Sequence, residues 1–298
     1  MSLKAIALMG ATGTGKSALA MRMAKVAGVS IICCDSMQLY RGLDIGTAKP
    51  TDAEREAVPH FMVDCCDLPG IYSAARWAKE ARVFIETENS QGRKPIIVGG
   101  TGLYLKALMQ GFADIPEDKA GVRQHFEALQ REAGTAALYA LLQQYDPDMA
   151  LRLQAGDTQR IMRALCVYES TGKPLSAWQE QEKEATPIDC PVFVLDVERD
   201  VLRQRLADRF HAMMQAGWLD EVRWLDALPL ADTHPAMRAV GYRQLLDHVH
   251  GKLSLEQAIT DGITATRRYA KRQVTWFKNQ TPDAVHGDSN TLENKMYG

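Results

Sequence analysis

Apolar residues recur in two alternating patterns along the N-terminal part of the chain. Short continuous apolar runs, typical of buried strands, occur at residues 4–9, 29–34, 60–67 and 94–100. Apolar residues three and four positions apart, as on one face of a helix, occur at residues 17–28, 72–92 and 101–111. Strands that alternate with helices predict a parallel, doubly wound sheet.

The pattern changes in the middle of the chain. Helical spacing with no strand candidate begins near residue 116 and continues to residue 185, most clearly at 122–134, 135–147 and 157–172. A strand-like apolar run returns at 190–197. Residues 200–280 again have helical spacing.

These patterns divide the chain into a core, an insertion and a tail. Residues 1–116 and 189–282 are expected to form an α/β core with a parallel sheet and C-terminal helices. Residues 117–188 are expected to form a helical insertion. Residues 283–298 are polar, and we expect a poorly ordered tail there.

Composition and charge place few limits on function. The 298 residues are 46% hydrophobic and carry a formal net charge of −2, as in an ordinary soluble globular protein. We find no signal peptide before the first strand and no apolar run near the ~18 residues of a membrane span, so we expect a cytoplasmic protein without a membrane partner. The six cysteines include no C-x-x-C pair, which favours reduced, mostly buried thiols.

The strongest motif is GATGTGKS at residues 10–17. Its G-x-x-x-x-G-K-S spacing, between a predicted strand and a predicted helix, is that of a phosphate-binding P-loop. The glycines let backbone N–H groups surround phosphate oxygens, Lys16 supplies a cation, and Ser17 is placed to bind Mg²⁺. The motif predicts a P-loop NTPase-like core with a diphosphate site made by Gly10, Thr12, Gly13, Thr14, Gly15, Lys16 and Ser17.

Two further segments follow predicted strands of the same sheet. Asp35 ends the second strand and faces the crevice that holds the phosphates, as a general base, a metal ligand or a helix cap. The run at 94–100 ends in Gly-Gly, where a nucleotide hydrolase usually has an aspartate, and this disfavours an ATPase or a kinase. Thr101 comes next, either as a helix cap or as a hydroxyl aimed at the phosphates.

Basic side chains gather in three places. Arg205 and Arg209 lie four residues apart on one predicted helix face and can converge on a diphosphate. Residues 262–282 carry five basic residues, no acid and interleaved aromatics. That pattern suits a nucleic-acid surface, or a helix that packs its aromatics on the core and solvates its charges. The insertion carries a further polar cluster, Gln159, Arg160 and Arg163.

Together these motifs resemble one family, the bacterial tRNA dimethylallyltransferases, also called tRNA isopentenyltransferases. The matching stretches run in one order from residue 10 to residue 277, almost the whole chain. They include GATGTGKS, DSMQLYRGLDIGTAKP, PHFMVD, GGTGLYLKAL, DTQRIMRAL, RLADRF, VGYRQL and TRRYAKRQVTWF. The combination of DSMQ, GGTGLY and VGYRQ is highly specific.

The resemblance implies a reaction. The P-loop would bind dimethylallyl diphosphate with Mg²⁺, and the dimethylallyl group would pass to N6 of adenosine 37 beside the tRNA anticodon, releasing pyrophosphate. Asp35 would take a proton from the adenine amine, with Thr101, Lys16 and Arg209 as the other catalytic residues. The partners would be dimethylallyl diphosphate and the anticodon stem-loop of tRNA, and the enzyme would be a monomer.

The resemblance also implies which residues contact tRNA, with the insertion binding the anticodon arm. They are Asp35, Ser36, Met37, Gln38, Thr101, Arg123, Gln159, Arg160, Ile161, Met162, Arg163, Val240, Gly241, Tyr242, Arg243, Gln244 and Leu245. Two other functions compete with this interpretation. One is a small-molecule kinase that consumes ATP, and the other is a non-catalytic NTPase that binds RNA.

Overall fold

The computed structural model describes residues 2–111, 115–116, 118–180 and 187–297, and the chain divides into two compact units. The core unit comprises Met1–Met109 and Thr186–Gly298, and the helical unit comprises Gln110–Ala185. Residue 117, where we expected the insertion to begin, and residues 181–186, near its expected end, lie outside the described residues.

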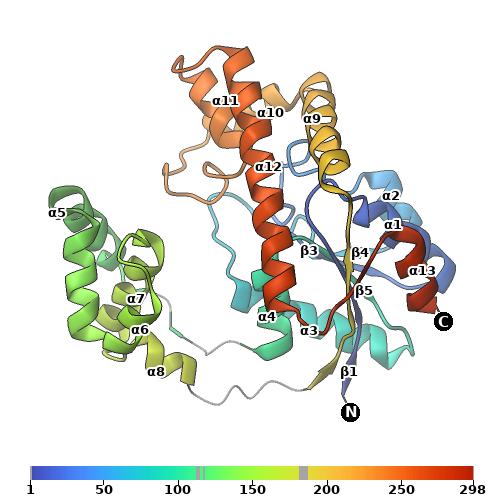
Figure 1. The fold of residues 1–298 in the computed structure, drawn as a ribbon, viewed down its shortest axis with the longest axis horizontal. Helices are drawn as coiled ribbons and strands as arrows, with labels where there is room; N and C mark the ends of the chain where they lie inside the picture. The colour runs from blue at the N-terminus through green and yellow to red at the C-terminus, as the bar shows by residue number, and fades with distance from the viewer. Residues whose placement is uncertain (1, 112–114, 117, 181–186, 298) are drawn as a thin grey trace. The chain divides into compact units, whose positions relative to one another are not determined.

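A six-stranded parallel sheet runs through the core unit (Figure 1). Its strand order is β4 (His60–Phe61), β3 (Ile31–Cys34), β5 (Ile96–Gly99), β2 (Ile6–Met9), β7 (Val192–Leu195) and β8 (Val285–Gly287). A separate parallel pair joins β1 (Leu3–Lys4) to β6 (Ile188–Asp189). The predicted strands are confirmed. However, β4 is shorter than its apolar run, because Met62 and Asp64 turn the chain with φ values of 61° and 52°.

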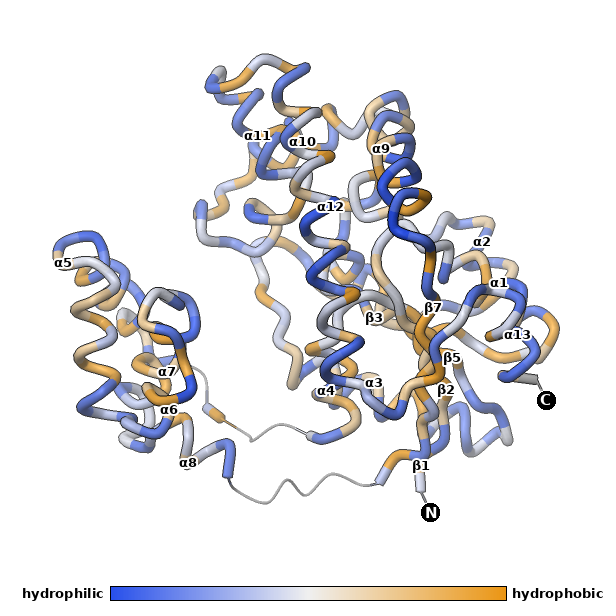
Figure 2. Tube along the Cα trace, in the orientation of Figure 1, coloured by the Kyte–Doolittle hydropathy of each residue, from blue (hydrophilic) through white to orange (hydrophobic). Residues whose placement is uncertain are grey.

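Successive strand residues supply two separate cores on the two faces of the sheet. Ile32 and Cys34 belong to the cluster on one face, whereas Ile31 and Cys33 belong to the cluster on the other. Figure 2 shows β2, β5 and β7 among the most hydrophobic segments of the chain. All six cysteines are free, as the absence of a C-x-x-C pair led us to expect.

Helices cover both faces of the sheet, because each face presents apolar side chains that need a partner. One face packs against α1 (Lys16–Ala27) and α13 (Ser289–Tyr297). The cluster on the other face includes α3 (Ala74–Ser90), α4 (Gly102–Gln110) and α12 (Leu255–Gln280). It continues away from the sheet through α9 (Arg199–Gln215), α10 (Trp218–Asp226) and α11 (Tyr242–Val249), which pack on one another and on α12. A short helix, α2 (Asp52–Ala57), begins at a capping box made by Thr51 and Glu54.

The described part of the helical unit contains helices and no strand. Its helices are α5 (Val122–Tyr145), α6 (Pro147–Arg152), α7 (Thr158–Thr171) and α8 (Leu175–Glu180). Gly134 interrupts α5 with a φ of 78°, at the junction between the two segments that the sequence pattern separated. Leu138, Leu142, Ile161 and Leu165 are fully or almost fully buried in this unit's own core, so α5 and α7 stabilise each other.

The expected tail at 283–298 was wrong. Val285–Gly287 pairs with β7 as the edge strand β8, and the α13 residue Leu292 is fully buried. The α1 side chain Arg22 also donates to Ser289 at 3.1 Å and to Glu293 at 3.3 Å. Few apolar side chains occur in this polar segment, so its pattern did not reveal that they fill a gap beside α1.

Leu292→Ala should therefore destabilise the protein by about 3 kcal/mol, because it removes a fully buried side chain and leaves a cavity. Urea unfolding followed by circular dichroism measures the free energy of unfolding. The matched control is Asn290→Ala on the same helix, at an exposed position, which should change stability by less than about 0.5 kcal/mol. Equal stability of both variants would show that α13 is not docked.

Candidate functional site

The P-loop connects β2 to α1 at the carboxyl edge of the sheet. Gly15 is the N-cap of α1 with a φ of 92°, and Gly13 has a φ of 82°. A Cβ at Gly13 would lie 2.7 Å from the Leu206 side chain on α9, so only glycine fits there. Because β5 pairs with β2 and β3 pairs with β5, all in parallel, the segments after these three strands meet at one edge of the sheet.

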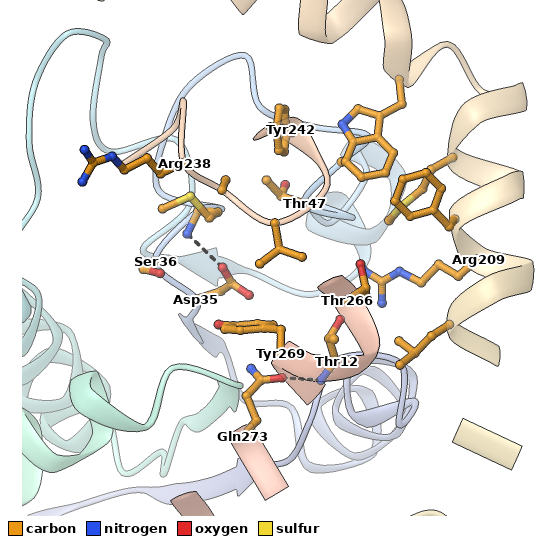
Figure 3. A pocket seen from close by; sticks show the side chains of 18 of the residues that line it. Thr12, Asp35, Ser36, Thr47, Arg209, Arg238, Tyr242, Thr266, Tyr269 and Gln273 are labelled. Carbon is orange, nitrogen blue, oxygen red and sulfur yellow. Dashed lines mark hydrogen bonds between the residues drawn. The ribbon is translucent and has the colours of Figure 1, made fainter. Parts of the chain in front are cut away.

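A cavity of about 310 Å³ opens above this edge, within the core unit (Figure 3). Eight of the residues proposed from sequence line it: Thr12, Lys16, Asp35, Ser36, Met37, Arg209, Val240 and Tyr242. In Figure 3, Asp35 and Arg209 extend into this space from opposite sides. The cavity therefore joins the P-loop, the candidate base and a second cation.

Lys16 and Arg209 are two cations held in a poorly solvated place. Desolvation lowers the pKa of Lys16 to about 8; the Asp35 carboxylate opposes this change, and the Arg209 charge adds to it. Burial likewise lowers the pKa of Arg209, again opposed by Asp35. The Lys16 Nζ donates to the Ala11 carbonyl at 3.2 Å. An anion with more than one charge would stabilise both cations.

Asp35 is held by one oxygen and leaves the other available. Its Oδ1 accepts the Met37 backbone N–H at 2.9 Å, and Oδ2 has no hydrogen-bond partner among the described residues. Thr101 supports the same turn, because its Oγ1 accepts the Ser36 N–H at 3.1 Å and its own N–H donates to the Cys34 carbonyl at 3.1 Å. Asp35 thus caps a turn and presents a carboxylate oxygen to the cavity, so the two roles are compatible.

Gln273 on α12 is a site residue that the sequence did not reveal. Its Oε1 accepts the Thr12 N–H of the P-loop at 2.9 Å, and its Nε2 donates to the Gly100 carbonyl at 2.9 Å. A Cβ at Gly100 would lie 2.2 Å from that Nε2. The two glycines at the end of the β5 run could have signalled that another segment approaches the backbone there, but they do not indicate which residue does so.

The aromatics of the basic segment 262–282 take different roles. Phe277 is buried in the core, and Trp276 packs so closely on α4 that a Cβ at Gly102 would lie 2.2 Å from its ring. Tyr269 and Arg272 instead line the cavity. The core-packing interpretation is thus confirmed for the two aromatics at the C-terminal end.

Glu221 on α10 is the second unpredicted site residue. Its carboxylate accepts the backbone N–H groups of Asp44, Ile45 and Gly46 at 2.8, 2.7 and 3.0 Å. It also accepts the Tyr242 hydroxyl at 2.5 Å, and burial followed by this negative charge raises the pKa of Tyr242. One carboxylate therefore fixes two walls of the cavity.

Other proposed residues of the core unit lie outside the cavity. Arg205 and Arg243 are exposed, and the Gln244 side chain caps α11 by accepting the Gly241 N–H at 2.9 Å. Gln38 donates to the carbonyls of Thr47 and Ala48. The Leu245 side chain is fully buried in the core, so only its backbone is available for the predicted tRNA contact.

Ser17 lies at a second, smaller cavity of about 70 Å³ that it shares with Gln38 and Glu54. In the part of the chain that is described, no three His, Cys, Asp or Glu side chains cluster as metal ligands do. Magnesium prefers oxygen ligands and often takes most of them from substrate phosphates and water. The Ser17 hydroxyl fits that donor set when a diphosphate supplies the remaining oxygens.

The proposed RNA residues of the helical unit divide by burial. Arg160 pairs with Asp157 at 3.4 Å, Arg163 pairs with Asp118, Arg123 pairs with Glu127 at 3.1 Å, and Gln159 is exposed. The two apolar residues between Arg160 and Arg163 are Ile161 and Met162, and their side chains face the unit's core, so only their backbone is available for the predicted tRNA contact. Their burial holds α7 in place and leaves its polar side chains outside.

A protein-family model described as IPP transferase matches residues 38–280. The chain belongs to the IPP transferase family. It is 43% identical over 299 residues to the tRNA dimethylallyltransferase of Azorhizobium caulinodans, covering 99% of this chain and 95% of that one. It is 46% identical over 281 residues to the Rhodospirillum centenum enzyme of the same name, covering 94% and 90%.

Solved structures of this family have the same P-loop α/β fold. The full-length tRNA isopentenylpyrophosphate transferase of Bacillus halodurans aligns with a TM-score of 0.72 at 32% identity, over 100% of this chain and 96% of that one. A eukaryotic dimethylallyltransferase captured acting on tRNA aligns with a TM-score of 0.81 at 30% identity, over 97% and 74%. Among the described helices of this IPP transferase family member, none is long and apolar enough to cross a membrane.

The lowered pKa of Lys16 predicts how diphosphate binding depends on pH. Below a pH of about 8 the ammonium is charged and binds the anion; above it the free protein loses this proton. The affinity should then fall by up to ~10-fold per pH unit. Isothermal titration calorimetry with dimethylallyl diphosphate between pH 7 and pH 9.5 measures the change.

The control for this titration is Lys16→Arg, because a guanidinium stays charged over the whole range. That variant should show only the titration of the ligand itself. Parallel pH profiles for the wild type and Lys16→Arg would contradict the assignment of a titrating Lys16 to the diphosphate.

Proposed function

We propose that this chain transfers the dimethylallyl group of dimethylallyl diphosphate to N6 of adenosine 37 in tRNA. The observation that carries the proposal is a single cavity that joins a P-loop to the Asp35 carboxylate, with Lys16 and Arg209 beside them. The names of its relatives support the same reaction. Diphosphate binding and proton removal are the two tasks that this prenyl transfer requires.

The reaction balances as a substitution at the allylic carbon. The C–O bond to the diphosphate breaks, its electron pair leaves with pyrophosphate, and a C–N bond forms to the adenine amine. That amine is a poor nucleophile because it is conjugated with the ring, so removal of its proton by Asp35 Oδ2 assists the attack. The adenine must leave its stack to reach the carbon.

Charge on the departing pyrophosphate is stabilised by groups already in place. The P-loop amides, Lys16 and Arg209 surround the position of the leaving group, and their desolvation strengthens each interaction. Ser17 would hold Mg²⁺ together with oxygens of the diphosphate. When bound, the ion would supply further positive charge at the leaving group.

Gln273 and Thr101 position these groups. Gln273 ties the P-loop to the end of β5, and Thr101 ties the end of β5 to the turn that carries Asp35. The proposed enzyme is a monomer, and the proposal needs no side chain from a second subunit. The free cysteines and the tRNA substrate favour action in the cytoplasm.

A phosphoryl-transferring kinase is less well supported. The β5 strand ends at Gly99, and Gly100 follows it. A Cβ at Gly99 would lie 1.9 Å from the Cys34 carbonyl oxygen, and a Cβ at Gly100 would lie 2.2 Å from the Gln273 side chain. No acidic side chain fits at the position where such enzymes order magnesium.

The assay of the proposed function is incubation with dimethylallyl diphosphate, Mg²⁺ and unmodified tRNA, followed by nuclease digestion and mass spectrometry. Isopentenyl adenosine formed without ATP supports the proposal, and a strict ATP requirement overturns it.

Asp35→Asn should lower turnover by ~10²–10⁴-fold, because the amide cannot take a proton at neutral pH. Its Oδ1 still accepts the Met37 N–H, so the turn is kept. The affinity for dimethylallyl diphosphate should stay within a few-fold. Single-turnover kinetics and calorimetry measure the two quantities. Wild-type turnover would leave Asp35 with only the capping role, whereas a large loss of affinity would assign it to the magnesium shell.

The helical unit is proposed to bind the anticodon arm through Arg160 and Arg163. Changing both to alanine should weaken tRNA binding. A plot of the logarithm of the association constant against the logarithm of the salt concentration should become less steep, its slope smaller in magnitude by ~1.5, since two phosphate contacts no longer release counterions. Filter binding over a series of salt concentrations measures this slope. The double change to lysine is the control and should keep it. An unchanged slope in the alanine variant would place the RNA contacts elsewhere.

A further inference from the structure

One face of α9 forms an apolar wall that begins at the P-loop. Leu206, Phe210 and Met213 line the cavity at a spacing of four and three residues, which places them on one helix face. The wall starts at the P-loop because the Leu206 side chain packs against Gly13: a Cβ built on Gly13 would lie 2.7 Å from it. From Leu206 to Met213 the helix rises by roughly 10 Å.

The wall ends at Trp218, at the start of α10. The Phe210 and Trp218 ring centroids are 4.8 Å apart at an interplanar angle of 56°, and Trp218 is only 2% exposed. It lines the cavity while its other sides are enclosed by protein. The indole therefore bounds the cavity where the α9 wall ends.

Two glycines and one carboxylate fix the position of this indole. Cβ atoms at Gly46 and Gly241 would lie 2.0 and 2.1 Å from the Trp218 ring, so the backbone touches it on two sides. Glu221, one turn further along α10, binds the Gly46 N–H at 3.0 Å and the Tyr242 hydroxyl at 2.5 Å. Glu221 thus holds the two backbone segments that pack against the indole, which leaves the ring little room to move.

The cavity is thus polar at one end and apolar along one wall. If Lys16 and Arg209 hold the diphosphate at the P-loop end, the hydrocarbon tail of the substrate would extend along Phe210 and Met213, which line the same cavity. A tail one isoprene unit longer extends further from the same diphosphate position and meets the fixed indole.

We propose that Trp218, with Met213 beside it, limits the transferred group to a single isoprene unit. This inference rests on the proposed prenyl transfer and adds its chain-length specificity. The discrimination is steric, and an apolar pocket wall can discriminate against one additional methylene by ~10–200-fold. For a whole isoprene unit we expect a ratio of at least ~10²-fold in kcat/KM for dimethylallyl over geranyl diphosphate.

The experiment measures kcat/KM for both diphosphates with unmodified tRNA, in the wild type and in three variants. Trp218→Ala removes the end of the cavity and should lower the ratio by at least ~10-fold. Met213→Ala opens the partly buried wall without removing a core aromatic, and should lower the ratio by several-fold. The matched control is Trp224→Ala, because Trp224 is also on α10 but packs on Gly42, outside the cavity, and is 43% exposed.

The outcomes separate this inference from the proposed function. A wild type that forms no product from dimethylallyl diphosphate overturns the function and the inference together. A wild type that is active but uses both diphosphates equally overturns the inference alone. If Trp218→Ala does not fold, Met213→Ala decides, and an unchanged ratio in a folded Met213→Ala variant overturns the inference. A reduced ratio that Trp224→Ala does not share supports it.

Discussion

Parallel pairing of β3, β5 and β2 brings three separate loops of this chain to one edge of the sheet. The pairing is possible only because the backbone at the end of β5 is bare: a Cβ at Gly99 would lie 1.9 Å from the Cys34 carbonyl oxygen. With that contact made, Thr101 reaches the turn after β3, and the P-loop lies alongside. The turn that carries Asp35 depends on this close approach.

Long-range hydrogen bonds then hold the helices over this edge. Gln273 links α12 to both the P-loop and the end of β5, and Glu221 links α10 to the 44–46 backbone and to α11. The Gln273 and Glu221 side chains both accept hydrogen bonds from backbone N–H groups. They therefore replace the hydrogen bonds that these N–H groups would otherwise make to water. The cavity is therefore shaped before any substrate arrives, which reduces the cost of ordering the site on binding.

The charges that line the cavity suit an anionic substrate whose proposed leaving group gains negative charge as it departs. Lys16 and Arg209 are both desolvated, and Asp35 offsets only part of their positive charge. A diphosphate completes the balance. Asp35 also has a structural bond to Met37 through one oxygen, so its second oxygen is oriented without support from a ligand.

The sequence determined the elements and the chemistry that local spacing encodes. Apolar periodicity located the main strands and helices. The P-loop spacing located the Lys16 cation and the neighbouring Ser17 hydroxyl, because both signals depend on residues close together in the chain. The quoted motifs were also sufficient to indicate the family.

Tertiary structure decided which side chains share a space. Thr12 and Gln273 meet across 261 positions, and no local pattern records such a pair. Arg205 and Arg209 have the same helical spacing as any pair on one face, yet only Arg209 lines the cavity, since packing alone decides which turn of α9 faces inward. Ile161, Met162 and Leu245 belong to family-like motifs but fill cores, and Leu292 anchors a segment that looked like a polar tail. Burial depends on what a folded partner covers, and that information exists only in three dimensions.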